Sequence, residues 1–160
     1  ALNNPDINFI GIEKYTSIVA RALKKLENLK VPNLKIINGD ALELNEIFAK
    51  EISTIYLNFS DPWPKERHTK RRLTSRVFLS IYDDIFKSDG VIIQKTDNVN
   101  LFESSIISLT NYGYKIVDIS LDLWKTDKTY EETEYEHKFK SQGVKINYLK
   151  AVKLSNLKNL

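Results

Sequence analysis

The 160-residue chain contains no cysteine, no methionine and no long apolar run. Without cysteine it has no disulfide, no thiolate metal ligand and no cysteine nucleophile, and this suits the reducing cytoplasm, where we expect it. No apolar run approaches the roughly 18 to 20 residues that a membrane span needs. The N-terminus also lacks the charged and then apolar pattern of a signal peptide. We therefore expect a globular protein with neither a membrane nor a metal as a partner.

The charge of the chain is distributed unevenly. Its net charge is +3, and 42% of its residues are hydrophobic, a composition typical of one globular domain. We expect a single domain at residues 1–154 and a tail at residues 155–160. The cations gather in one short stretch, at Lys65, Arg67, Lys70, Arg71, Arg72 and Arg76. A later stretch is acidic, at Asp127, Glu131, Glu132, Glu134 and Glu136. This asymmetry predicts a local anionic partner.

Strand and helix patterns alternate along most of the chain. Apolar spacing predicts strands at residues 8–12, 34–37, 54–59 and 91–95, and helices at residues 17–29, 42–49, 75–86 and 101–109. Such alternation indicates an α/β protein with a parallel sheet. Residues 115–123 and 144–152 instead alternate apolar and polar side chains, as the strands of an antiparallel hairpin do.

Four carboxylates, Glu13, Asp40, Asp61 and Asp97, follow predicted strands, and ligands bind at this edge of a parallel sheet. Glu13 lies where nucleotide-binding sheets place an acid for the two ribose hydroxyls, but a cap of the next helix explains it equally well. Asp40 either meets an adenine amino group or caps the helix from Leu42. Together, Glu13 and Asp40 favour an adenosine-containing cofactor without separating NAD from S-adenosylmethionine.

In the stretch NFSDPWPKERHTKRRL, residues 61–64 (DPWP) are expected to form a stiff corner after the third predicted strand. Pro62 and Pro64 restrict the backbone on either side of Trp63 and exclude a helix. Asp61 beside such a corner fits methyl transfer to a planar base, on which Trp63 stacks. The alternative for Trp63 is a core residue that covers the sheet edge. The corner therefore favours S-adenosylmethionine over NAD.

The basic residues after the corner lead into the helix predicted at residues 75–86. A helix N-terminus is a poor electrostatic place for cations, because the helix dipole prefers anions there. We therefore favour a bound phosphate backbone over solvated charges as the explanation.

In this order, NFIGIE, NGDA, TIYLNFSDPWPK, HTKRRL, QKTD and TEYE closely resemble the bacterial tRNA (guanine-N7-)-methyltransferase family over nearly the whole chain. The resemblance implies a class I S-adenosylmethionine-dependent methyltransferase fold, which is Rossmann-like and mainly parallel, with an antiparallel C-terminal hairpin. It implies S-adenosylmethionine as cofactor, tRNA as partner, and methylation of guanine N7 at position 46 of the tRNA variable loop. The oligomeric state is left open, a homodimer included.

The resemblance also implies roles for individual residues. Glu13 and Asp40 match cofactor contacts, and Asp61 matches a residue assigned to both the cofactor and catalysis. The implied substrate contacts are Lys65, Asp97, Thr133, Glu134, Tyr135 and Glu136. The implied RNA-binding segment is Arg67, His68, Thr69, Lys70, Arg71 and Arg72. Without the resemblance, TEYE would be interpreted as a solvated, acidic helix start.

The start of the chain departs from the family. Family members carry a first strand that ends in an acid, and a glycine-rich turn, ahead of the segment that matches NFIGIE. The sequence starts at Ala1, seven residues before NFIGIE, and contains no methionine. We therefore expect an N-terminally incomplete domain that is part of a longer protein.

Two other functions remain as alternatives. An exocyclic-amine nucleic-acid methyltransferase has an acid-proline-proline-aromatic corner that resembles DPWP only loosely. A non-catalytic RNA-binding fragment is the second. Nicotinamide oxidoreduction ranks last, because no hydride-handling group of residues is visible.

Overall fold

The computed structural model describes residues 1–126 and 130–153. Asp127 of the acidic stretch and the tail expected at residues 155–160 lie outside these described residues. The chain separates into two compact units, Ala1–Ile47 and Phe48–Leu160.

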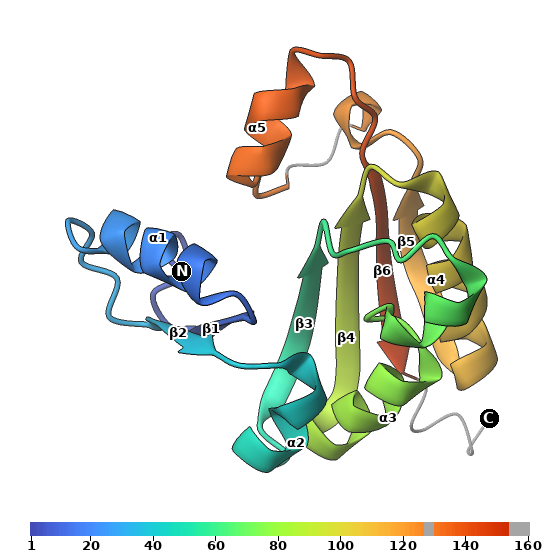
Figure 1. Cartoon of the computed structure of the whole chain (residues 1–160), viewed down its shortest axis with the longest axis horizontal. Coiled ribbons are helices and arrows are strands. Elements are labelled where there is room, and N and C mark those ends of the chain that lie inside the picture. Colours follow the sequence, from blue (N-terminus) through green and yellow to red (C-terminus); the bar gives the residue numbers. More distant parts are fainter. Residues whose placement is uncertain (127–129, 154–160) are drawn as a thin grey trace. The chain divides into compact units, whose positions relative to one another are not determined.

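The first unit is a two-stranded parallel sheet with a connecting helix (Figure 1). Its elements are β1 (Phe9–Glu13), α1 (Thr16–Leu26), β2 (Leu34–Asn38), the 3-10 helix η1 (Ala41–Glu43) and α2 (Leu44–Ile47). One helix was expected at residues 42–49, but the chain forms two short pieces there. The Asp40 side chain accepts a hydrogen bond from the Leu42 N–H and caps the first piece.

The second unit contains a four-stranded mixed sheet (Figure 1). Its elements are β3 (Ile52–Asn58), η2 (Glu66–Arg71), α3 (Arg76–Ile85), β4 (Phe86–Thr96), α4 (Val99–Tyr112), β5 (Tyr114–Ser120), η3 (Leu123–Lys125), α5 (Glu134–Lys140) and β6 (Asn147–Lys153). The strand order is β3-β4-β6-β5, with β3 parallel to β4 and β6 antiparallel to both β4 and β5. The predicted parallel pairing and the antiparallel C-terminal hairpin are therefore confirmed.

Helices α3 and α4 cover one face of this sheet and enclose its core (Figure 1). The buried core side chains include Leu79, Tyr82 and Ile85 of α3, Leu101, Phe102 and Leu109 of α4, and Ile92, Leu149 and Ala151 of the strands. Caps at both ends extend α4 beyond the predicted residues 101–109. Asn98 Oδ1 accepts from the Leu101 N–H at 2.8 Å, and Gly113 ends the helix at a φ of 104° that favours glycine.

Two residues of α4 allow a matched test of this core. Leu109 is 0% exposed and Ile107 is 61% exposed. We expect Leu109→Ala to lower the free energy of unfolding by about 2–5 kcal/mol, because it leaves a cavity. Ile107→Ala should change it by no more than about 0.5 kcal/mol. Urea denaturation of both variants measures the difference, and equal losses would contradict the assigned core.

Candidate active site

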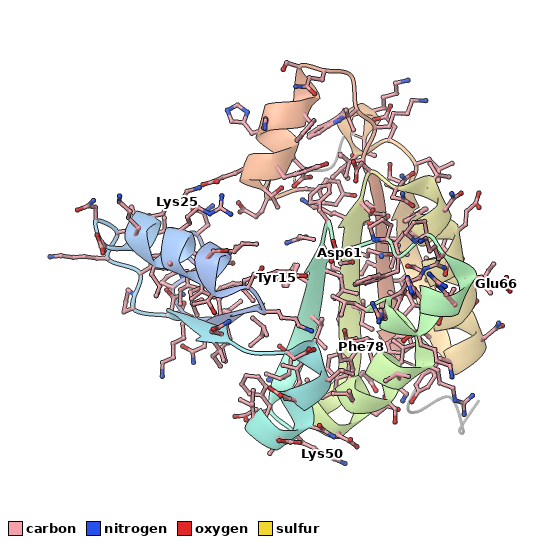
Figure 2. The ribbon with its side chains drawn as sticks, in the orientation of Figure 1. Tyr15, Lys25, Lys50, Asp61, Glu66 and Phe78 are labelled. Atoms are coloured by element: carbon pink, nitrogen blue, oxygen red, sulfur yellow. The ribbon has the colours of Figure 1, made fainter. Side chains whose placement is uncertain are left out.

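The carboxyl ends of β3 and β4 lie side by side because the two strands are parallel. Asn58 is paired with Lys95, and the Phe59 N–H donates to the Lys95 carbonyl at 2.9 Å. Asp61 follows the end of β3 (Figure 2). Asp97 follows the end of β4. Both are exposed. Two of the four predicted acids therefore occupy one edge of one sheet.

The corner that carries Asp61 has a strained backbone. Phe59 and Trp63 have φ angles of 52° and 43°, so non-glycine residues occupy the left-handed region on both sides of Asp61. Such conformations cost about 1–3 kcal/mol each and persist where the surrounding structure holds them. They are common at functional sites.

Arg72 holds this corner in place. Its Nε donates to the Pro62 carbonyl at 3.0 Å and its Nη2 to the Trp63 carbonyl at 3.2 Å. Its Nη1 donates to Ser104 Oγ of α4 at 2.6 Å. The guanidinium therefore ties the corner to a core helix, a role that sequence reasoning missed. Its expected contact with RNA stays a prediction.

Most of the basic residues do not lie at the N-terminus of α3, so that expectation is wrong for all of them except Arg76. Arg67, Lys70 and Arg71 lie in η2, and the chain is extended at Arg72 before α3 begins at Arg76. The dipole of α3 therefore does not act on most of these cations. Lys65, Arg67, Lys70 and Arg71 are exposed, whereas His68 and Thr69 are half-buried. The exposed members still present positive charge to solvent.

Trp63 is half-buried and contacts the basic segment. The Arg71 guanidinium carbon lies 4.9 Å from the centre of the indole ring, a cation–π contact. The His68 ring meets the Trp63 ring edge-on at 5.7 Å. The stacking of a base on Trp63 stays a prediction.

The TEYE segment forms the start of α5. Thr133 Oγ1 accepts from the Glu136 N–H at 3.2 Å, and Glu136 Oε2 accepts from the Thr133 N–H at 2.7 Å. This reciprocal pair is a capping box, which fixes the first turn of the helix. Glu134, in the same turn, is exposed.

Tyr135 connects this helix to the strand ends. Its hydroxyl donates to Asp97 Oδ2 at 3.0 Å, and its ring centre lies 4.2 Å from that of Phe59. Burial, followed by the hydrogen bond to Asp97, raises the pKa of Tyr135 above its ordinary value. The structure thus brings the Asp61 corner, Asp97 and the TEYE segment to one edge.

Glu136 is fully buried against a residue that the sequence reasoning missed. Both of its carboxylate oxygens accept from Lys95 Nζ, at 3.0 and 3.1 Å. The pair could have been suspected from the lysine in the strand segment Gln94–Thr96, because this segment is buried and a buried charge requires a partner. The expected contact of Glu136 with substrate stays a prediction, because its carboxylate is engaged with Lys95 and Thr133.

The other two acids lie together in the first unit, at adjacent ends of β1 and β2. Glu13 Oε1 accepts from the Tyr15 N–H at 2.8 Å. Asp40 Oδ1 accepts from the Leu42 N–H at 3.0 Å, and Asp40 Oδ2 accepts from Lys14 Nζ at 2.6 Å. Asp40 therefore caps η1, whereas Glu13 binds the N–H of Tyr15, the residue before α1. The cofactor roles of both residues stay predictions.

Across residues 1–126 and 130–153, no group of three or more His, Cys, Asp or Glu side chains is arranged to hold a metal ion. Within the same ranges, every helix is too short or too polar to cross a bilayer.

Comparisons with known proteins point to methyltransferases. A family model, Methyltransf_4, described as "Putative methyltransferase", matches residues 1–149. The chain is 52% identical over 150 residues to a tRNA (guanine-N(7)-)-methyltransferase of Bacillus cytotoxicus, covering 92% of this chain and 69% of that relative.

Solved structures share the fold at low identity. An antibiotic-related methyltransferase aligns with a TM-score of 0.65 and 18% identity, over 95% of this chain and 78% of the other. Fibrillarin, a pre-rRNA processing protein of Methanococcus jannaschii, aligns with a TM-score of 0.58 and 15% identity, over 90% of this chain but only 55% of the other. The fold is that of the class I methyltransferases, as expected. The chain belongs to the tRNA (guanine-N7-)-methyltransferase family, whose cofactor is S-adenosylmethionine.

Proposed function

We propose that this chain carries out the S-adenosylmethionine-dependent methylation of guanine N7 in tRNA, at position 46 of the variable loop, in the cytoplasm. The observation that carries the proposal is the gathering of the strained Asp61 corner, Asp97 and the TEYE segment at one sheet edge. The 52% identity to a tRNA (guanine-N(7)-)-methyltransferase supports the choice of reaction and substrate.

Glu13 and Asp40 fit the adenosine part of the cofactor. Both are carboxylates at adjacent ends of parallel strands, where nucleotide-binding sheets place acceptors for ribose hydroxyls. The hydrogen bond from Lys14, followed by that from the Leu42 N–H, holds the pKa of Asp40 below its ordinary value of 3.8. Asp40 is therefore an anion at neutral pH and accepts hydrogen bonds. We also propose Asp61 as a cofactor contact, on the strength of the family match alone.

The cofactor supplies an electrophilic methyl group on a sulfonium sulfur. Guanine N7 carries an in-plane lone pair and no proton, so the chain does not need a general base to create the nucleophile. The purine would gain positive charge as its N7–methyl bond forms and the methyl–sulfur bond breaks, with a neutral thioether as the leaving group. Asp61, held beside the ring, would orient the base and stabilise that charge.

Recognition of guanine requires acceptors for its N1–H and its exocyclic amino group. Asp97 is exposed at the sheet edge and accepts one hydrogen bond from Tyr135, so its carboxylate has capacity for more. The Thr133 hydroxyl and the exposed Glu134 begin the adjacent helix. Lys65, exposed before η2, supplies a cation close in sequence to Asp61.

The direct test is methyl transfer from labelled S-adenosylmethionine to bulk tRNA by the natural full-length protein, with nucleoside analysis of the product. We expect N7-methylguanosine at one position. Asp61→Ala should lower turnover at least about 1,000-fold, because the charge-stabilising carboxylate is lost, while tRNA affinity stays within a few-fold. Methylation of an exocyclic amine would refute the proposed reaction. Binding of tRNA without any methylation would favour a non-catalytic RNA-binding fragment.

The exposed cations and Arg72 should behave differently when tRNA binding is measured against salt. Arg67→Gln and Lys70→Gln should each weaken binding and lower the slope of log K against log salt by about 1, because each removes a phosphate contact. Arg72→Gln should reduce turnover more than binding, since Arg72 holds the Pro62 and Trp63 carbonyls. Equal effects of the three variants on the salt slope would contradict this division.

The Lys14–Asp40 ion pair makes a prediction about acid. Because the folded-state pKa of Asp40 is lowered, its contribution to stability is present above the unfolded-state pKa near 3.8 and is lost as the pH falls through the folded value. Lys14→Met should raise the Asp40 pKa toward 3.8 and weaken this acid dependence, while the hydrogen bond from the Leu42 N–H keeps part of it. Carboxyl NMR titration measures the shift. Lys24→Met, which changes an exposed lysine of α1, is the control and should leave the Asp40 pKa in place.

A further inference from the structure

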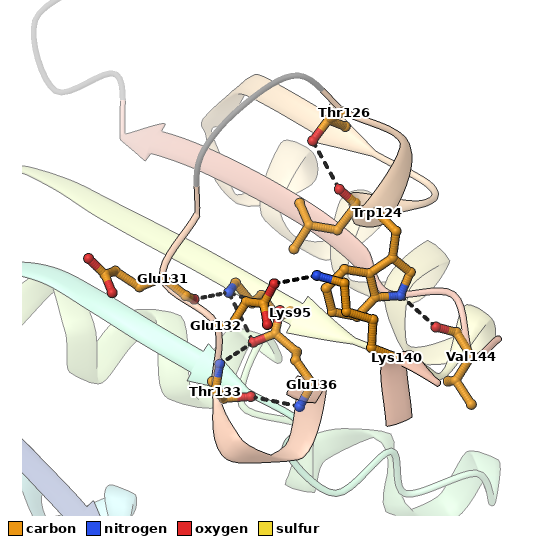
Figure 3. Close-up of polar contacts among 10 residues, drawn as sticks. Lys95, Trp124, Thr126, Glu131, Glu132, Thr133, Glu136, Lys140 and Val144 are labelled. Carbon is orange, nitrogen blue, oxygen red and sulfur yellow. Dashed lines mark hydrogen bonds and ion pairs between the residues drawn. The ribbon is translucent and has the colours of Figure 1, made fainter. Parts of the chain in front are cut away.

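A buried lysine joins the end of β4 to the segment that opens α5 (Figure 3). Lys95 Nζ donates to the Glu131 carbonyl at 2.6 Å and to both oxygens of Glu136. Its side chain is 7% exposed, and that of Glu136 is 0% exposed. The ammonium has three donors, and the two residues supply three acceptors for them.

The same lysine also holds the segment that leads to Asp61. Its carbonyl accepts from the Phe59 N–H at 2.9 Å, and the Phe59 ring packs on Tyr135 of α5. Tyr135 in turn donates to Asp97, two residues after Lys95. The contacts therefore form a closed ring from β4 to α5, to the end of β3, and back to β4.

We propose that Lys95 is a positioning residue that anchors the Thr133–Glu136 turn over the ends of β3 and β4 and thereby aligns the guanine-binding edge. Lys95 itself does not touch substrate. It acts through Glu136, whose carboxylate simultaneously caps the Thr133 N–H. The effect of Lys95 on the KM for tRNA can be measured only if the proposed function is right. The anchoring of α5 can be measured by hydrogen exchange without catalysis.

Burial explains why this pair is suited to anchoring. A carboxylate and an ammonium that are both removed from water require each other, so release of α5 would leave each charge without its partner. The short helix α5 has seven residues and depends on such tertiary contacts for its order. A second lysine–glutamate pair of the same segment, Lys140 with Glu132 at 2.7 Å, is exposed at 50% and 41%. It provides a matched comparison.

The experiment compares Lys95→Met with Lys140→Met in the natural full-length protein. Four quantities are measured for both variants: hydrogen exchange of the α5 amides, the KM for tRNA, kcat and the Kd for S-adenosylmethionine. In Lys95→Met we expect α5 exchange and the KM for tRNA each to rise at least 10-fold, with the cofactor Kd within two-fold of wild type. Lys140→Met should stay within two-fold throughout. Lys95→Arg keeps the charge, so its KM for tRNA and its α5 hydrogen exchange should both lie between those of Lys95→Met and wild type.

An unchanged KM for tRNA in Lys95→Met would overturn the inference even if α5 exchanges faster, because α5 would then be held without aligning the site. Unchanged α5 exchange would overturn the anchoring. Should Lys95→Met fail to fold, Glu136→Gln provides the test, since it keeps an acceptor for the Thr133 N–H and removes the opposite charge. A wild-type protein that methylates no tRNA would refute the proposed function, while its α5 exchange would still report on the anchor.

Discussion

The parallel pairing of β3 with β4 is the constraint on which the candidate active site depends. It brings the two carboxyl ends together, so Asp61 and Asp97 reach one edge although a helix and a long strand separate them along the chain. Helices α3 and α4 cover one face of this pair and bury its core. The sheet therefore supplies rigid supports, and the segments that follow the strands carry the chemical groups.

Two cations, Arg72 and Lys95, hold the Asp61 corner and the start of α5 in place, and they do so in different ways. Arg72 binds two backbone carbonyls of the corner and a serine of α4, and so stabilises a conformation that is unfavourable at Phe59 and Trp63. Lys95 is buried with Glu136, and loss of one partner from such a pair typically costs about 3–5 kcal/mol. Both side chains have a structural role at the site, which distinguishes them from the exposed cations of η2.

This division changes the interpretation of the basic segment. Arg67, Lys70 and Arg71 lie in η2 and not at the start of α3, where Arg76 lies, so the helix dipole gives no reason to expect a phosphate beside them. The case for RNA now depends on the exposure of Arg67, Lys70 and Arg71 and on the family to which the chain belongs. Trp63, covered by Arg71, would have to exchange that cation for a base in order to stack on it.

The sequence by itself determined the strands, the helices α1, α3 and α4, the acids at the strand ends and the mixed character of the sheet, because apolar periodicity and turn residues act over a few positions. It did not predict η2 or η3. The observed helix boundaries differ from the predicted ones where a side chain caps the first turn, as Asp40 does for η1 and Asn98 for α4. Only the tertiary structure decided that Lys95 pairs with Glu136, 41 residues away, and that Arg72 holds the corner against Ser104, 32 residues away. Such pairings depend on which buried groups meet after the sheet has formed, and no local pattern encodes that meeting.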